Sequence, residues 1–329
     1  MGYGNYSYSA HAALVAGRAN QSRSEVFKQV QCHALMNPKG LKVRECRDSA
    51  DHPETLGIMF ALDVTGSMGN IPHLLAKEEL PNLMKLLTDC HVADPQVMFM
   101  AVGDATSDNA SLQVGQFEAT AELMDQWLTW SYLEGGGGGS GHESYELAFY
   151  IAAQHTDTDN WAKRKKKGYF FMTGDEFPYP AVSRHQVEAL IGEKLDEDIP
   201  IEEVIAAAAE MYHLFFLIPD EYRAKKVGDR WRKLLGDHTI CMESPKDTCS
   251  VAAAIVGLTE KRIADLDELA KVLNTNGIDR GHIASTIRAV QHYAALLNPQ
   301  AVAAVSPPPV AAASPQPATQ ESWWKRLFG

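Results

Sequence analysis

The sequence predicts a doubly wound α/β fold with a mostly parallel central sheet and helices on both faces. Five short apolar runs in the middle of the chain are typical of strands that are buried on both sides. Amphipathic stretches separate these runs, and helices between buried strands require a parallel sheet with right-handed crossovers. The runs are LGIMFAL (56–62), QVMFMAV (96–102), GYFFMT (168–173), HLFFLI (213–218) and HTICM (238–242).

Three helices are predicted from apolar residues that recur at helical spacing. Two of them lie between or beside the last strands, and the third belongs to residues 246–297, which we expect to cover one face or an edge of the sheet. The apolar positions are Ile201, Val204, Ile205 and Ala208 in the first, Val227, Trp231, Leu234 and Leu235 in the second, and Ile283, Ile287, Val290, Ala294 and Leu297 in the third.

The 329 residues divide into four regions by composition. Residues 1–55 form a polar N-terminal extension, and residues 56–245 form the α/β domain. Residues 246–297 are a helical segment. Residues 298–329 are a tail rich in Pro and Ala, which we expect to be a solvated, disordered linker that ends in an aromatic motif.

The composition excludes several classes of protein. With 30 basic and 42 acidic residues the formal charge is −12, which argues against general nucleic-acid binding and favours divalent cations or basic partners. Five cysteines without a CxxC pair do not suggest a secreted disulfide framework. We expect no signal peptide and no transmembrane segment, and we expect the protein to work in the cytoplasm.

The first strand runs directly into Asp63-Val64-Thr65-Gly66-Ser67. Loops at the carboxyl ends of strands bind ligands in such sheets. A carboxylate and two hydroxyls within five residues are hard oxygen donors of the kind that suit Mg²⁺. The alternative is an ordinary strand-to-helix turn, in which Thr65 or Ser67 only caps the next helix.

A second loop is rich in glycine. Glu134 is followed by five glycines, then by Ser140, Gly141, His142 and Glu143. No Lys-Ser/Thr follows, as a Walker loop requires, and His142 stands where a nucleophile elbow needs Gly. We therefore expect a loop that brings Ser140 and Glu143 toward a shared centre.

Two further carboxylates follow strands. Asp175 comes after GYFFMT, and Asp104 comes after QVMFMAV. A single Asp at a strand end is usually a turn former or a helix cap. Several carboxylate- and hydroxyl-bearing loops at one edge of a sheet instead favour a binding site.

These loops together resemble the metal-ion-dependent adhesion site (MIDAS) of von Willebrand factor A (VWA) domains, a Rossmann-like family. Asp63, Thr65 and Ser67 match the family pattern Asp-x-Ser/Thr-x-Ser at the end of an apolar strand. Ser140 stands where the family has a Thr in a later loop. The family's last element is an Asp, commonly in Thr-Asp-Gly; here Thr173-Gly174-Asp175 displaces it by one residue.

Both departures are similar to the VWA subgroup of VWA-coupled alpha-kinases. That subgroup has a Gly-Gly-Gly-Asp-x-Pro-Glu loop and a Gly-Asp-Ala-Pro-type loop at these places. In this comparison Ser140 replaces the Asp and Glu143 keeps the Glu. The resemblance covers residues 56–245, and the chain has no kinase motifs.

The resemblance implies a Mg²⁺ site (or one for Mn²⁺ or Ca²⁺) that an acidic side chain of a protein partner completes, without chemical turnover. Bacterial proteins of this kind often work beside AAA+ ATPases or in multi-protein complexes, so such a partner is implied here. The implied metal site residues are Asp63, Thr65, Ser67, Ser140, Glu143 and Asp175.

Two other functions remain open at this stage. A strand-end Asp followed by Thr suggests a metal-dependent phosphohydrolase, but the second Asp that such enzymes need is replaced by Thr65. The domain would instead be a structural scaffold with an empty site if the Ser140 and Asp175 departures abolish metal binding.

The end of the tail carries a separate prediction. Trp323 and Leu327, and Trp324 and Phe328, are i, i+4 pairs beside Lys325 and Arg326. Large aromatic residues on a long tether favour a motif that docks on a partner. Weak membrane-surface attachment and folding back onto the α/β domain are the alternatives.

One basic run lies outside these loops. Residues 163–167 read Lys-Arg-Lys-Lys-Lys, directly before the strand GYFFMT. Cations are favourable at the C-terminus of a helix. We therefore expect a solvated helix end here, in preference to a binding patch.

Overall fold

The structure, a computed structural model, describes residues 4–66, 68, 70–135 and 139–298. Its centre is a six-stranded sheet in the order β12-β11-β7-β2-β3-β4, in which all neighbours are parallel except the antiparallel pair β3 and β4. The predicted doubly wound α/β fold is therefore confirmed. The strands of this sheet are β2 (Leu56–Asp63), β3 (Pro95–Val102), β4 (Leu112–Val114), β7 (Gly168–Thr173), β11 (Tyr212–Ile218) and β12 (Thr239–Cys241).

The sheet separates two hydrophobic cores, and β2 contributes to both. All eight residues of β2 are buried. Ile58 and Phe60 face one core, whereas Met59 and Ala61 face the other, because successive side chains of a strand point to opposite faces. A strand buried on both sides has no polar face, which explains its uninterrupted apolar sequence.

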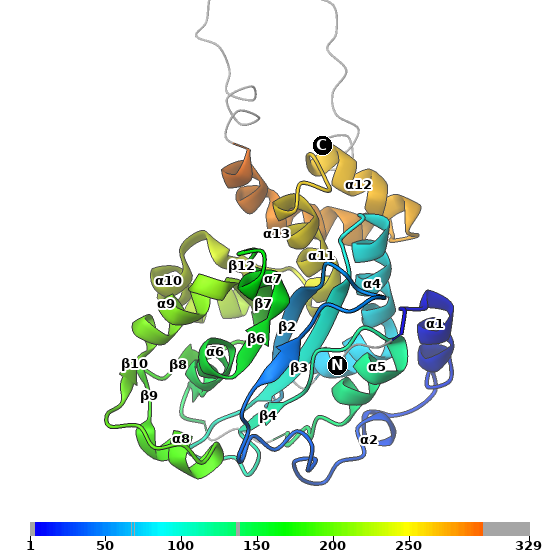
Figure 1. Ribbon diagram of the computed structural model, residues 1–329. Helices are drawn as coiled ribbons and strands as arrows, with labels where there is room; N and C mark the ends of the chain where they lie inside the picture. The colour runs from blue at the N-terminus through cyan, green and yellow to red at the C-terminus, as the bar shows by residue number, and fades with distance from the viewer. Residues whose placement is uncertain (1–3, 67, 69, 136–138, 299–329) are drawn as a thin grey trace, which may run out of the picture.

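Helices cover both faces of the sheet (Figure 1). The long stretch after β12 belongs to one of these layers, where α11 has eleven buried residues out of twelve. The first face is covered by α4 (Leu80–Asp89), α5 (Ala121–Thr129), α11 (Thr248–Thr259), α12 (Leu266–Thr275) and α13 (Arg280–Leu297). The second is covered by α6 (Tyr145–Gln154), α8 (Arg184–Leu190), α9 (Ile201–Met211) and α10 (Glu221–Leu235).

The predicted apolar stripe of α13 is buried for most of its length. Ile283, Ile287 and Val290 are buried, because α13 packs on α11 and α12. Leu297, at the end of the helix, is 44% exposed. Residues 246–297 thus cover one face of the sheet, which answers the question that the sequence left open.

The N-terminal residues pack on the α/β domain. Helix α1 (Tyr8–Ala16) contacts α4 and α5, and α2 (Arg23–Val26) follows it. Strand β1 (Arg44–Cys46) pairs in parallel with β6 (Thr156–Thr158). A buried ion pair between Arg18 and Asp125, 2.5 Å long, links the segment after α1 to α5.

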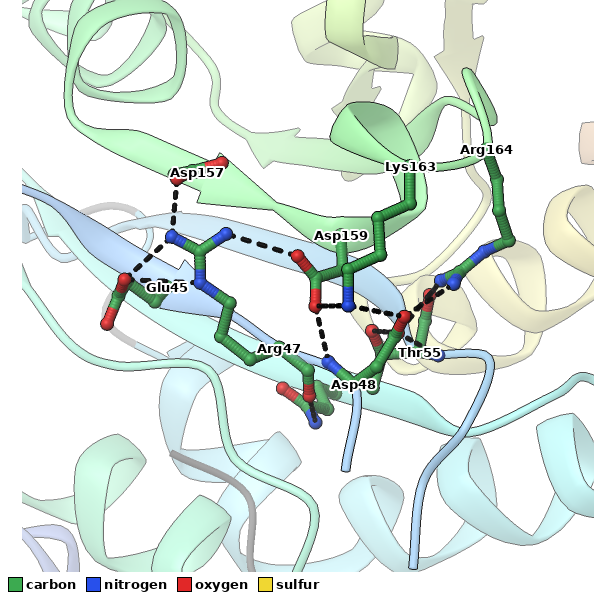
Figure 2. A network of polar contacts seen from close by, with 9 residues as sticks. Glu45, Arg47, Asp48, Thr55, Asp157, Asp159, Lys163 and Arg164 are labelled. Atoms are coloured by element: carbon green, nitrogen blue, oxygen red, sulfur yellow. Dashed lines mark hydrogen bonds and ion pairs between the residues drawn. The ribbon is translucent and has the colours of Figure 1, made fainter. Parts of the chain in front are cut away.

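A network of ion pairs continues this attachment beyond β1 (Figure 2). Arg47 pairs with Glu45, Asp157 and Asp159, and Asp48 pairs with Lys163 and Arg164. Helix α7 (Asp159–Ala162) ends directly before the basic run, as its position suggested. The first two residues of that run are not simply solvated, because they bind the carboxylate of Asp48.

Short elements complete the described chain. A π-helical turn, η1, lies between α3 and α4, where α3 begins soon after the first loop. Within the described residues, no helix has both the length and the apolar character needed to cross a membrane. The short elements are α3 (Asn70–Leu74), η1 (Leu75–Glu79), β5 (His142–Glu143), β8 (Phe177–Pro178), β9 (Ala181–Val182), β10 (Ile199–Pro200), η2 (Gly236–His238) and η3 (Pro245–Asp247).

Candidate metal centre

The candidate site lies where the strand order reverses. From β2 the chain continues to β3 on one side, while β7, which comes later in the chain, lies on the other side. Doubly wound sheets bind ligands at such a switch point, outside the carboxyl ends of the strands. Asp63 ends β2 opposite Val102, and Leu62 is level with Thr173, the last residue of β7. The loops that follow β2 and β7 therefore leave the sheet side by side.

The first loop folds back on its own carboxylate. Asp63 is fully buried, and its Oδ1 accepts hydrogen bonds from the backbone N of Thr65 at 2.9 Å and from Thr65 Oγ1 at 2.5 Å. This local turn holds the carboxylate at the strand end. Ser67, the third residue of the predicted motif, lies outside the described residues.

A tyrosine hydroxyl joins the first loop to the loop after β7, here called the third loop, which carries Gly174, Asp175 and Glu176. Tyr145 opens α6, and its Oη donates to Asp63 Oδ2 at 2.6 Å. Tyr145 Oη in turn accepts hydrogen bonds from the backbone N of Asp175 at 3.2 Å and from the backbone N of Glu176 at 3.4 Å. Sequence reasoning did not select Tyr145, although it directly follows the predicted second loop.

The two carboxylate oxygens of Asp175 have different surroundings: one pairs with an arginine, and the other is buried without a partner among the described residues. Asp175 Oδ2 lies 2.8 Å from Nε of Arg223, which also pairs with Asp220, the N-cap residue of α10. Asp175 Oδ1 is buried and has no hydrogen-bond partner among the described residues. Arg223 was also missed from the sequence, although the loop after β11 opens at the same edge and carries Asp220.

The two predicted site residues of the second loop, Ser140 and Glu143, lie in different surroundings. The exposed Ser140 has its Oγ 3.2 Å from Asp104 Oδ2 and 3.0 Å from the backbone O of His142, so its described hydrogen bonds are with Asp104 and His142 rather than with Asp63 or Asp175. Tyr179 and Thr106 also donate to Asp104. Burial acts to raise the pKa of Asp104, but these hydrogen bonds outweigh it and lower the pKa below its usual value.

Glu143 lies in β5, beside Pro178 of β8. It is only 4% exposed, and its Oε2 has no hydrogen-bond partner among the described residues. Burial, together with the negative charges of Asp63, Asp108, Asp104 and Asp175, raises the pKa of Glu143 to about 9. The charges of Asp63, Asp104 and Asp175 therefore act on the carboxyl of Glu143.

Burial also raises the pKa of Asp63 to about 7. The hydrogen bonds from Thr65 and Tyr145 act in the opposite direction, and the charge of Asp175 adds to the rise. Such a cluster is electrostatically unfavourable as it stands, because buried like charges repel one another and have lost their hydration.

The oxygens at this edge are of the chemical type that hard divalent cations bind. Among the buried side-chain oxygens at this edge, Glu143 Oε2, Thr173 Oγ1 and Asp175 Oδ1 have no hydrogen-bond partner within the described residues. Carboxylate and hydroxyl oxygens are the ligands that Mg²⁺ and Ca²⁺ take. Within the described ranges, no group of three His, Cys, Asp or Glu side chains is arranged so that these alone could hold a metal ion.

The second predicted binding element lies outside the described part of the chain. Residues 299–329 include the predicted docking residues Trp323, Trp324, Leu327 and Phe328. That motif stays a prediction from the sequence.

Comparison with known proteins finds similarity at the level of solved structures. No protein-family model and no curated protein matches the chain. Similar structures include the pilus adhesin SpaC from Lactobacillus rhamnosus GG in its open conformation, at 10% identity over 66% of this chain and 31% of the adhesin, with a TM-score of 0.44. Proximal thread matrix protein 1 from the mussel byssus matches at 9% identity over 65% of this chain and 48% of that protein, with a TM-score of 0.39.

A von Willebrand factor type A structure from Catenulispora acidiphila is also similar, at 12% identity over 63% of this chain and 43% of that chain, with a TM-score of 0.35. The matches thus span less than half the length of each of these three proteins.

Proposed function

We propose that this protein is a metal-dependent binding protein of the VWA type, which holds a divalent cation, Mg²⁺ in the first instance, at the switch point of its sheet. A protein partner then contributes an Asp or Glu side chain to the cation. In this proposal the protein acts by binding and carries out no chemical turnover.

The observation that supports the proposal is the cluster of buried carboxylates around the unpartnered oxygens. The charge of Asp175 raises the pKa of Asp63, and the charges of Asp63 and Asp175 together raise the pKa of Glu143. A divalent cation would offset this repulsion and would give Glu143 Oε2 and Asp175 Oδ1 the partner that they lack. We propose these two oxygens as ligands, with Asp63 acting directly or through water.

The remaining residues of this edge orient the ligands. Thr65 fixes Asp63, and Arg223 holds one oxygen of Asp175 so that the other faces inward. When bound, the cation would act as a Lewis acid that accepts a carboxylate from the partner. Because Mg²⁺ usually retains several waters, a partner carboxylate can replace one of them.

Metal binding can be measured without knowing the partner. Addition of Mg²⁺ is expected to raise the Tm of the wild-type protein, because a ligand at 100 times its Kd stabilises the folded state by about 2.7 kcal/mol. The Asp175→Asn variant, which removes the charge but keeps the shape, is expected to lose this shift. The exposed Asp229 supplies a matched control, so Asp229→Asn should respond like the wild type.

Partner binding is tested by affinity capture with the wild type and with Asp175→Asn, each with and without a chelator. Proteins that are captured only by the wild type, and only without chelator, would support the proposal. Equal Mg²⁺ responses of the wild type and Asp175→Asn would contradict the metal site itself.

One set of contacts favours a second candidate function, a structural scaffold without a metal. Tyr145 already donates to Asp63, and Arg223 already neutralises part of the charge of Asp175. If these protein groups are sufficient, Mg²⁺ will leave the Tm of the wild type unchanged.

A further inference from the structure

We propose that Tyr145 is the positioning residue of this site: its hydroxyl sets the spacing between the loop that carries Asp63 and the loop that carries Asp175. This inference rests on the proposed metal site. It assigns a role to a residue that belongs to neither of those two loops.

Tyr145 Oη makes all the hydrogen bonds that a hydroxyl can make. It donates its single proton to Asp63 Oδ2, and its two lone pairs accept from the backbone N of Asp175 and of Glu176. No lone pair remains to coordinate a cation. Tyr145 therefore holds the two loops together and is not itself a ligand.

The ring of Tyr145 is fixed in its place by the core. It is fully buried, and it packs edge-on against Phe216 and Trp231, with ring centroids 5.5 and 5.6 Å away. Edge-to-face contacts of this kind favour one orientation of the ring. The hydroxyl is thus presented to the switch point at a defined position.

Gly174, in the third loop, lies directly against the hydroxyl of Tyr145. A Cβ atom at position 174 would lie 2.5 Å from Tyr145 Oη and 2.8 Å from Phe216 Cζ, closer than real Cβ atoms approach. Only glycine therefore lets the backbone of this loop approach the hydroxyl. The close approach of the loop to Tyr145 therefore requires glycine at position 174, directly before Asp175.

The chain offers a matched control on the same helix. Tyr150 is also buried in α6, and its hydroxyl donates to a carboxylate, Glu193 Oε2, at 2.9 Å. Tyr145→Phe and Tyr150→Phe each remove one hydroxyl that donates to a carboxylate, but only the first removes it from the switch point.

The test measures the Kd for Mg²⁺ by calorimetry and for Mn²⁺ by electron paramagnetic resonance, together with the Tm without metal. We expect both variants to lower the metal-free Tm. We expect Tyr145→Phe alone to weaken metal binding by about tenfold or more, the usual effect of removing a group that orients metal ligands. Gly174→Ala, which displaces the hydroxyl without removing it, should weaken metal binding in the same way.

Each result decides between the hypotheses. If the wild type binds neither Mg²⁺ nor Mn²⁺, the proposed function fails and this inference fails with it. If the wild type binds metal and Tyr145→Phe binds it equally well, only the inference is overturned. Loss of the fold in Tyr145→Phe would also overturn it, because the hydroxyl would then support the whole domain rather than the spacing of two loops.

Discussion

Arg164 binds both carboxylate oxygens of Asp48, with Nη1 2.7 Å from Oδ2 and Nη2 3.1 Å from Oδ1 (Figure 2). Thr55 donates to the same carboxylate through its backbone N and its hydroxyl. Burial acts to raise the pKa of Asp48, but these partners outweigh it and hold the pKa well below its usual value. The contact ties the chain before β2 to the segment after α7.

Replacing Asp48 with Ala is expected to lower the free energy of unfolding by about 2–3 kcal/mol, because charge-assisted and bidentate hydrogen bonds are the strong ones. The loss should be measured by urea denaturation at pH 7. Since the pKa of Asp48 is depressed in the folded state, its contribution is present above the ordinary carboxyl pKa of about 4 and is lost as the pH falls below it.

Asp229 is the control for this prediction. Its side chain is 96% exposed and pairs only with Arg232, at 3.2 Å, among the described residues. Asp229→Ala should change the free energy of unfolding by less than about 0.5 kcal/mol, as isolated surface pairs do. Equal effects of Asp48→Ala and Asp229→Ala would mean that the network does not hold the N-terminal segment.

The central strands could be predicted because burial on both faces leaves a continuous apolar run. β2, β7 and β11 match the predicted runs to within one residue at either end. β4 was not predicted, because three residues, Leu112–Val114, are too few to show a period. The role of Asp48 was also hidden, since its partner Arg164 lies 116 residues away.

The candidate site could likewise be predicted only in part from the sequence. Asp63 and Asp175 could be found because strand ends are recognisable in the sequence. Tyr145 was missed because a tyrosine that begins an apolar helix reads as a core residue, and it is indeed fully buried. Only the packed structure shows that its hydroxyl reaches Asp63.

Glu79 is expected to make the stability fall as the pH rises. It ends η1, is 7% exposed, and its Oε2 has no partner among the described residues. Burial raises its pKa to about 7; Asn82 and Lys246 act in the opposite direction, whereas Glu78 and Asp247 add to the rise. Ionising this carboxyl therefore costs folding free energy.

The direction follows from proton linkage. The folded state holds the proton of Glu79 more tightly than the unfolded state, so the cost is absent below the unfolded pKa of about 4.3, grows above it, and is complete above the folded pKa. A pKa raised from about 4.3 to about 7 corresponds to about 3–4 kcal/mol, since a tenfold change in proton affinity is worth about 1.36 kcal/mol. Glu79→Gln should therefore stabilise the protein at pH 8 but not at pH 4.

Urea denaturation at both pH values measures this difference. Glu78, the preceding residue, is exposed and serves as the control. Glu78→Gln should change the free energy of unfolding by less than about 0.5 kcal/mol at either pH. A Glu79→Gln variant that is equally destabilised at pH 4 and pH 8 would show that the carboxyl has a partner in solution.

Trp231 is expected to support the third loop as well as the core. Its ring stacks on Phe216 with centroids 3.6 Å apart, and its Nε1 donates to the backbone O of Glu176 at 3.1 Å. Trp231→Phe keeps an aromatic ring but leaves a cavity and an unpaired carbonyl. We therefore expect a loss on the order of 2 kcal/mol in the free energy of unfolding.

Trp127→Phe is the control that distinguishes the cost of the cavity from the cost of the lost hydrogen bond. Trp127 Nε1 donates to Glu118 Oε1 at 3.1 Å, but its ring is only half-buried on α5. Trp127→Phe therefore loses an indole N–H hydrogen bond, here to a carboxylate, with little cavity, and its cost should be about 1 kcal/mol or less. If the two variants lose equal stability in urea denaturation, the packing of Trp231 against Phe216 adds nothing beyond the hydrogen bond.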